Sequence, residues 1–122
     1  MNPTLVPTQT FEHLVVDALD ALPPWLLPIV DEIAVLVEDE PDPDDAEQGL
    51  LCLGLYRGVP RTSHPGRVPG SLPDTITLYR IPVLLACDSP DDVPERVRIV
   101  LIHEVGHAMG LTESRLRSLG WQ

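Results

Sequence analysis

The sequence predicts a single domain, residues 1–122, that combines α-helices with β-strands. Apolar residues recur at helical spacing over residues 11–21 and 92–109. Three short runs between these segments are rich in β-branched or alternating apolar residues, as strands are. Hydrophobic residues make up 43% of the chain, which is enough for a modest core and excludes a wholly disordered polymer.

The first helix is expected from about Phe11 to Ala21, with Thr8 or Thr10 as its N-cap. Apolar side chains follow Phe11 at i+3, i+4, i+7 and i+8, so one face of this helix should lie on the core. Pro23-Pro24 ends the helix, because proline cannot continue its hydrogen bonding.

Three segments are predicted to be strands. Ile33–Glu38 is short, apolar and β-branched, which indicates a central strand. Leu50–Arg57 is the second expected strand. Thr75–Ile81 alternates with the period of two that is typical of a half-buried strand, and Pro82 then stops it.

Two segments between the strands are predicted to be loops. Residues 38–47 hold many acidic side chains and two prolines but lack the ligand order of a calcium-binding EF-hand, so a solvated loop is expected. Residues 58–73 are rich in glycine and proline, and such a long loop often forms the rim of a functional site. His64 lies in this loop. It is a candidate metal ligand or substrate contact, and the alternative is that it has neither role, like most exposed histidines.

The longest helix is expected to begin at Ser89-Pro90-Asp91-Asp92 and to end at Met109. Asp92 and Glu95 have capping-box spacing, and acidic residues at this end suit the helix dipole. Thr112 is the predicted N-cap of a final short helix.

The composition excludes several classes of function. The chain has 19 acidic and 8 basic residues and a net charge of −11, which argues against nucleic acid or an anionic membrane as its main partner. The N-terminus lacks the features of a signal peptide, and the apolar run over residues 21–30 is too short to span a bilayer. Cys52 and Cys87 do not form a disulfide framework, so we expect buried thiols in a cytoplasmic protein.

His103, Glu104 and His107 form an H-E-x-x-H motif within the longest helix. Residues four apart lie on the same face of a helix, so both imidazoles can reach one zinc ion. Glu104 then lies over the open side of the metal, where a general base is needed. Gly110 is expected to end the helix with a positive φ, and the chain returns Glu113 toward the histidines as a third ligand.

A coincidence of two core histidines four residues apart is the alternative explanation. The glycine and the acid that follow at set distances make coincidence rarer, and the helical setting is predicted independently. Two buried histidines without partners would also cost ~1–3 kcal/mol each. We therefore interpret the motif as a metal site with zinc as its cofactor.

The full pattern from His103 to Glu113, H-E-V-G-H-x-x-G-x-x-E, has the spacing of the metzincin zinc motif. The chain resembles the small bacterial zincin-like metallopeptidases over nearly its whole length, including residues 54–60, 72–80 and 113–121. This resemblance implies an α+β, zincin-like fold. In such a fold an N-terminal helix packs on a small three- to four-stranded mixed sheet, a long helix carries HExxH, and a short C-terminal helix follows.

The resemblance and the motif together predict a zinc-dependent metallopeptidase. Zinc is held by His103, His107 and Glu113, and Glu104 is the general base that acts on the zinc-bound water. A peptide or protein is the expected substrate.

The substrate is expected to lie along the strand Thr75–Ile81, paired with it as an added strand. Tyr79 and Arg80 are the candidate substrate-binding residues, and Tyr56 is a further candidate contact. Both tyrosines are explained equally well as ordinary strand residues.

Two departures from the metzincin pattern leave an alternative open. Glu113 replaces the third histidine, a change that zinc accepts. Only nine residues follow it and Met109 lies inside the motif, so we expect neither a Met-turn nor a lower subdomain that would close the cleft. The alternative is a zinc-binding module with little or no proteolytic activity that binds proteins or peptides. An open cleft also makes a homodimer possible.

Overall fold

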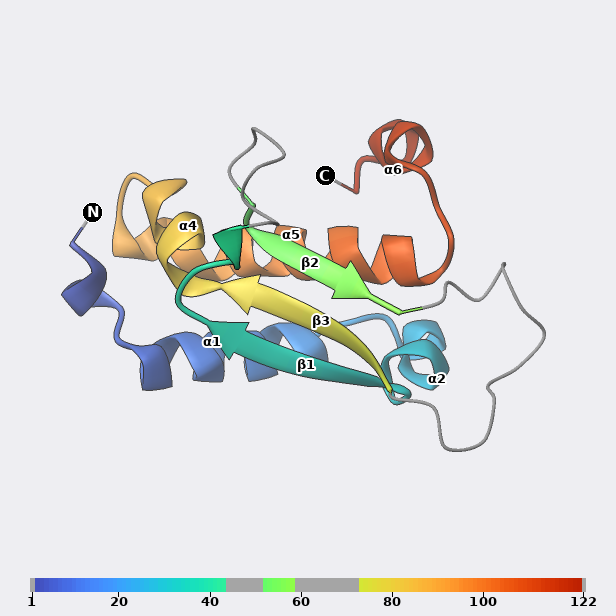
Figure 1. Ribbon diagram of the computed structural model, residues 1–122, viewed down its shortest axis with the longest axis horizontal. Helices are drawn as coiled ribbons and strands as arrows, with labels where there is room; N and C mark the ends of the chain where they lie inside the picture. Colours follow the sequence, from blue (N-terminus) through green and yellow to red (C-terminus); the bar gives the residue numbers. More distant parts are fainter. Residues whose placement is uncertain (1, 44–51, 59–72, 122) are drawn as a thin grey trace.

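A three-stranded mixed sheet forms the centre of the structure, and helices α1 and α5 lie across one of its faces (Figure 1). The computed structural model describes residues 2–43, 52–58 and 73–121. The strands are β1 (Ile33–Glu38), β2 (Gly54–Arg57) and β3 (Asp74–Tyr79), in the order β1-β3-β2. β3 runs parallel to β1 and antiparallel to β2. The expected α+β fold with a small mixed sheet is therefore confirmed.

β3 is the central strand of this sheet. It pairs with β1 along its whole length, beginning with Asp74 opposite Ile33, and with β2 on its other side. Its inward-facing Ile76 and Leu78 are fully buried. The prediction that Thr75–Ile81 adds an extended peptide at a free edge is therefore wrong, because both edges of β3 already carry a strand.

β3 also ends earlier than expected, at Tyr79. The next residue begins helix α4 (Arg80–Leu85). Pro82 lies in the first turn of α4, where its missing N–H leaves no hydrogen bond unmade. The N–H of Ile81 donates to the carbonyl of Asp39 at 3.0 Å, which holds the start of α4 against the end of β1.

The remaining helices precede β1 and follow α4. The first group contains η1 (Pro3–Leu5), α1 (Thr8–Asp20), η2 (Pro24–Leu26) and α2 (Leu27–Val30), and the second contains η4 (Pro90–Asp92), α5 (Val93–Ala108) and α6 (Glu113–Leu119). α1 packs on α5, and α5 packs on β2 and β3. Within the described ranges no single helix has the length and apolarity to cross a membrane. The bent pair Thr8–Asp20 and Pro24–Val30 meets the criteria of length and composition only when its two parts are taken together.

The predicted caps of two helices require correction. Neither Thr8 nor Thr10 caps α1, because Thr8 is its first helical residue and Pro7 precedes it in an extended conformation. The carbonyl of Pro7 accepts the N–H of Phe11 at 3.0 Å and so starts the helical bonding. At the second site the capping box joins Ser89 to Asp92. Asp92 already has helical dihedral angles, whereas an N-cap residue is extended.

The long helix α5 is anchored by its apolar stripe. Val97, Leu101, Val105 and Ala108 are all buried, as their spacing predicts. The first three join a core that also contains inward-facing residues of α1 and β3. This anchoring orients the opposite, more polar face of α5, which carries the histidines.

Candidate metal centre

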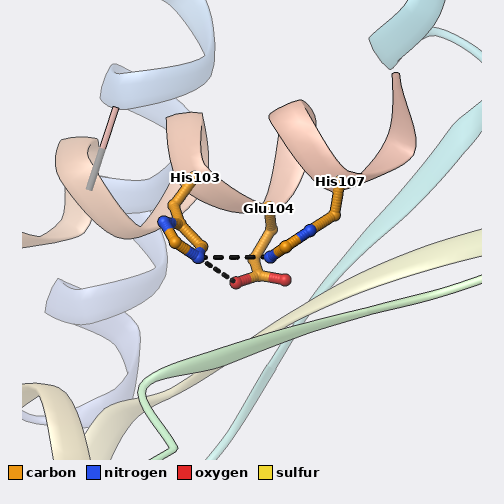
Figure 2. A group of neighbouring side chains, drawn as sticks. All are labelled: His103, Glu104 and His107. Carbon is orange, nitrogen blue, oxygen red and sulfur yellow. Dashed lines mark hydrogen bonds and ion pairs between the residues drawn. The ribbon is translucent and has the colours of Figure 1, made fainter. Parts of the chain in front are cut away.

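His103, Glu104 and His107 lie together on α5 beside the sheet (Figure 2). The histidines are four residues apart, and their Nε2 atoms approach to 3.2 Å. Both rings are partly buried, with 20% and 27% of the side-chain surface exposed. The helix therefore presents two imidazole nitrogens at one point of its surface, as the H-E-x-x-H spacing predicts.

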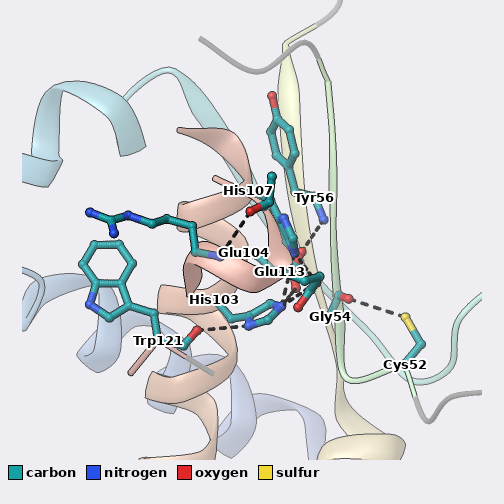
Figure 3. Close-up of polar contacts among 10 residues, drawn as sticks. Cys52, Gly54, Tyr56, His103, Glu104, His107, Glu113 and Trp121 are labelled. Atoms are coloured by element: carbon teal, nitrogen blue, oxygen red, sulfur yellow. Dashed lines mark hydrogen bonds and ion pairs between the residues drawn. The ribbon is translucent and has the colours of Figure 1, made fainter. Parts of the chain in front are cut away.

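The turn after α5 brings Glu113 to the same point (Figure 3). Gly110 has the expected positive φ of 86°, and its N–H donates to the carbonyl of His107 at 2.9 Å. Thr112 then caps α6 by accepting the N–H of Arg115 at 3.1 Å. Glu113 follows directly in the first turn of α6. The predicted sequence of helix end, cap and acid is thus present.

One carboxylate oxygen of Glu113 lies between the two imidazoles. Its Oε1 is 3.1 Å from Nε2 of His103 and 2.8 Å from Nε2 of His107. Burial opposes ionisation of this carboxyl group, but the neighbouring histidines hold the pKa of Glu113 below its usual range. The arrangement therefore favours the charged carboxylate that a metal requires.

The three atoms lie close enough together to be held by a single zinc ion. Ligand atoms on one tetrahedral zinc lie about 3.3 Å apart, given its usual bond lengths. Two unprotonated imidazole nitrogens and a carboxylate oxygen would repel one another at 3.2, 3.1 and 2.8 Å unless a proton or a cation lay between them. Two nitrogens and one oxygen also form a donor set that zinc accepts. The residues present therefore fit the predicted metal.

Glu104 differs from Glu113 in both its surroundings and its position. Its Oε1 accepts the backbone N–H of Tyr56 in β2 at 2.9 Å, and its Oε2 lies 4.0 Å from Nε2 of His103. Burial raises the pKa of Glu104, against the opposing effects of His107, His103 and the N–H of Tyr56. Glu104 is thus next to the three converging atoms without being one of them, as a proton acceptor should be.

The other side of His103 faces the end of the described chain. Its Nδ1 lies 3.0 Å from the backbone carbonyl of Trp121. A carbonyl oxygen only accepts hydrogen bonds, so Nδ1 must carry the proton. In the neutral ring, Nε2 then keeps its lone pair for the metal side. The role of Trp121 cannot be predicted from the sequence, because a backbone carbonyl leaves no signal in a residue pattern.

The side chains of the three proposed substrate-binding residues are buried or bonded to other residues. Tyr79 is buried, at 3% exposure. Arg80 is also buried, and its guanidinium donates to Asp39 and to the carbonyls of Pro3 and Val6. Arg80 therefore joins the N-terminal segment to the end of the sheet, and no contact of Tyr79 or Arg80 with the histidines is present among the described residues.

Tyr56 does reach the site, but through its backbone N–H. Its hydroxyl donates to Oδ2 of Asp74 at 2.7 Å, within the sheet. His64, the other candidate from the sequence, lies outside the described residues.

Comparisons with known proteins agree with this geometry. The family model for zincin-like metallopeptidases matches residues 30–121. Among solved structures, the chain is similar to a conserved hypothetical protein from Thermo thermophilus, with 23% sequence identity and a TM-score of 0.56, over 93% of this chain and 97% of that one. At this identity the likeness shows the fold alone. No curated protein sequence matches significantly.

The family match covers three quarters of the chain and contains every residue of the HExxH group. It also contains all three strands and the two helices, α5 and α6, that carry the converging side chains. On this basis the chain belongs to the zincin-like metallopeptidase family.

Proposed function

We propose that the protein is a zinc-dependent metallopeptidase, with His103, His107 and Glu113 as the zinc ligands and Glu104 as the general base. The observation that carries the proposal is the convergence of two Nε2 atoms and one Oε1 atom within 3.2 Å of one another. Glu104 stands beside this group with a separate anchor on β2. Two carboxylates with different environments thus suit two different tasks.

Zinc, when bound, supplies Lewis acidity that lowers the pKa of a water molecule and polarises a carbonyl group. Glu104 accepts a proton from the attacking water and delivers it to the leaving amine. Its burial supports this role, because a raised pKa makes the carboxylate a stronger base than an exposed one. The N–H of Tyr56 holds one oxygen of Glu104, which limits the directions in which the other oxygen can point.

The proposal is tested by measuring zinc stoichiometry and then cleavage of a broad peptide library. We expect one zinc per chain and cleavage by the wild type. Replacing Glu104→Gln should keep the zinc and abolish cleavage, with a loss of about 10²-fold or more, because general base catalysis is removed. Glu12→Gln, at an exposed position of α1, is the matched control and should leave both unchanged.

A zinc-binding module without proteolysis is the second candidate. It is favoured by the exposure of the site, since 60% of the Glu113 side chain is open to solvent. Enzymes of this chemistry gain from excluding water around the reacting groups. A wild-type protein that binds zinc tightly, yet cleaves nothing in the library, would establish this candidate in place of the peptidase.

A further inference from the structure

The C-terminal segment Glu113–Trp121 touches His103 at both of its ring nitrogens. At the start of the segment, Oε1 of Glu113 lies 3.1 Å from Nε2. At its end, the carbonyl of Trp121 lies 3.0 Å from Nδ1 (Figure 3). The first contact belongs to the proposed metal site, and the second does not.

Several contacts hold the Trp121 carbonyl in place. Gly120 ends α6 with a φ of 76°, and the N–H of Trp121 donates to the carbonyl of Leu116 at 2.9 Å. The Trp121 indole packs against Trp25, with ring centroids 6.3 Å apart. Leu116 is itself fully buried. The carbonyl is therefore attached to a packed helix end, which keeps its direction toward His103.

α6 approaches α5 closely at Gly106, inside the HExxH motif. A Cβ at this position would overlap Cδ2 of Leu116 and would lie 3.5 Å from Cε3 of Trp121. Because Gly106 has no side chain, the C-terminal segment can pack close enough to α5 to contact His103. Trp121 therefore packs next to α5, the helix that carries His103 and His107.

We propose that Trp121 is a positioning residue, whose backbone carbonyl holds His103 in the tautomer protonated at Nδ1. This tautomer leaves the Nε2 lone pair available on the side of Glu113 and His107. Free histidine favours the opposite tautomer, so the contact selects the form that binds metal. The importance of this contact for zinc rests on the proposed function, whereas the tautomer itself is a property of the metal-free chain.

A ring held in this way loses less freedom when a metal binds. Acceptors that orient metal-binding histidines typically contribute about 10–100-fold in metal affinity. Trp121 orients His103 with a main-chain oxygen. Replacing the indole side chain should therefore leave this orientation, and its contribution to metal affinity, in place. This property separates the proposal from a merely structural role of the tryptophan.

The test compares the wild type with Trp121→Phe and with a chain that ends at Gly120. Nitrogen-15 NMR of the histidine rings in the metal-free protein reports the tautomer directly. We expect His103 protonated at Nδ1 in the wild type and in Trp121→Phe, which keeps the carbonyl and an aromatic ring. In the shortened chain His103 should no longer favour the form protonated at Nδ1. Its zinc affinity should fall about 10–100-fold.

The outcomes separate this inference from the proposed function. A neutral His103 ring protonated at Nε2 and not at Nδ1 in the metal-free wild type overturns the inference, even if the shortened chain fails to fold. A shortened chain that is folded and binds zinc with unchanged affinity also overturns it, and leaves the metal site standing. A wild type with the Nδ1 tautomer but no zinc binding overturns the proposed function and upholds the role of Trp121.

Discussion

Two glutamates lie next to the same pair of histidines and differ in almost every physical respect. Glu104 is buried and bonded to the backbone of β2, and its pKa is raised by burial. Glu113 is largely exposed, and the histidines overcome its partial burial to lower its pKa. The charged form is therefore favoured where a ligand is proposed, and proton affinity is increased where a base is proposed.

Replacing Glu113→Ala should weaken zinc binding sharply. It removes the oxygen that lies within 3.1 Å of both imidazoles. A direct ligand should matter at least as much as the partners that orient ligands, so we expect a loss of about 100-fold or more. Competition with a chelator measures this affinity. Glu12→Ala is the control, and an affinity equal to that of the wild type would remove Glu113 from the site.

Replacing Glu104→Gln should stabilise the metal-free protein at pH 7. The folded protein disfavours the charged Glu104, since burial raises its pKa above that of the unfolded chain. Stability from this group is present at low pH and is lost as the pH rises through the folded-state pKa. The Gln variant should therefore have the higher Tm at pH 7, and the difference should shrink on acidification. Calorimetry with a chelator present measures this difference between about pH 4 and 8, the range over which carboxyl and imidazole groups titrate. A difference in Tm that grows on acidification would show that burial is not the dominant effect on Glu104.

At the scale of elements, two glycines control how α5 meets α6. Gly106 permits close packing of Leu116, and Gly110 permits the left-handed turn that returns the chain. Gly106 lowers the helix propensity of α5, and the packing of Leu116 against it offsets this cost. The site thus depends on the joint between two helices as well as on the side chains themselves.

Replacing Gly106→Ala should destabilise the protein, although alanine favours a helix by about 1 kcal/mol. The new methyl group overlaps the buried Leu116, and overpacking typically costs about 1–3 kcal/mol. Urea unfolding of the metal-free protein measures the change. In a Leu116→Ala background the same substitution should become nearly neutral or stabilising. Equal effects in both backgrounds would show that the two residues are not in contact.

Replacing Gly110→Ala should weaken zinc binding and lower stability by about 1 kcal/mol or more, because its φ of 86° is unfavourable for a residue with a Cβ. Gly110→Asn is the matched variant, since asparagine tolerates this conformation better. We expect Asn to recover part of both losses in chelator competition and thermal unfolding. Identical behaviour of the two variants would argue against backbone strain as the cause.

At the scale of the whole molecule, the proposed metal site joins the C-terminal segment to the centre of the fold. α5 packs on α1, β2 and β3, while α6 reaches the site through Glu113 and Trp121. β2 contributes through the N–H of Tyr56. The groups at this site are therefore oriented jointly by the sheet, by α5 and by α6.

Zinc should consequently raise the thermal stability of the folded protein. Binding to the folded state alone stabilises by about 2.7 kcal/mol when the free metal is at about 100 times its Kd. Calorimetry with zinc and with a chelator should show this difference in the wild type and not in His107→Ala. His13→Ala, an exposed position of α1, should retain it. A shift of equal size in the His107 variant would indicate zinc binding at another place.

Local patterns in the sequence were sufficient for much of this molecule. The spacing of His103, Glu104 and His107, the positive φ of Gly110 and the cap at Thr112 all depend on neighbours within a few residues. The helical and strand periodicities likewise identified the main elements, with errors of a few residues at their ends. Short-range sterics and hydrogen bonding determine these features, so they can be predicted from one sequence alone.

Only the tertiary structure decided which segments meet. The central place of β3 depends on pairing with strands distant in sequence, and a period of two in a strand is the same at the centre and at an edge. The bond from Tyr56 to Glu104 spans 48 residues, and the contact of Trp121 with His103 spans 18. Both use main-chain atoms, which every residue possesses. Residue identity therefore predicted the proposed ligands, whereas their backbone partners were determined by the way the whole chain packs.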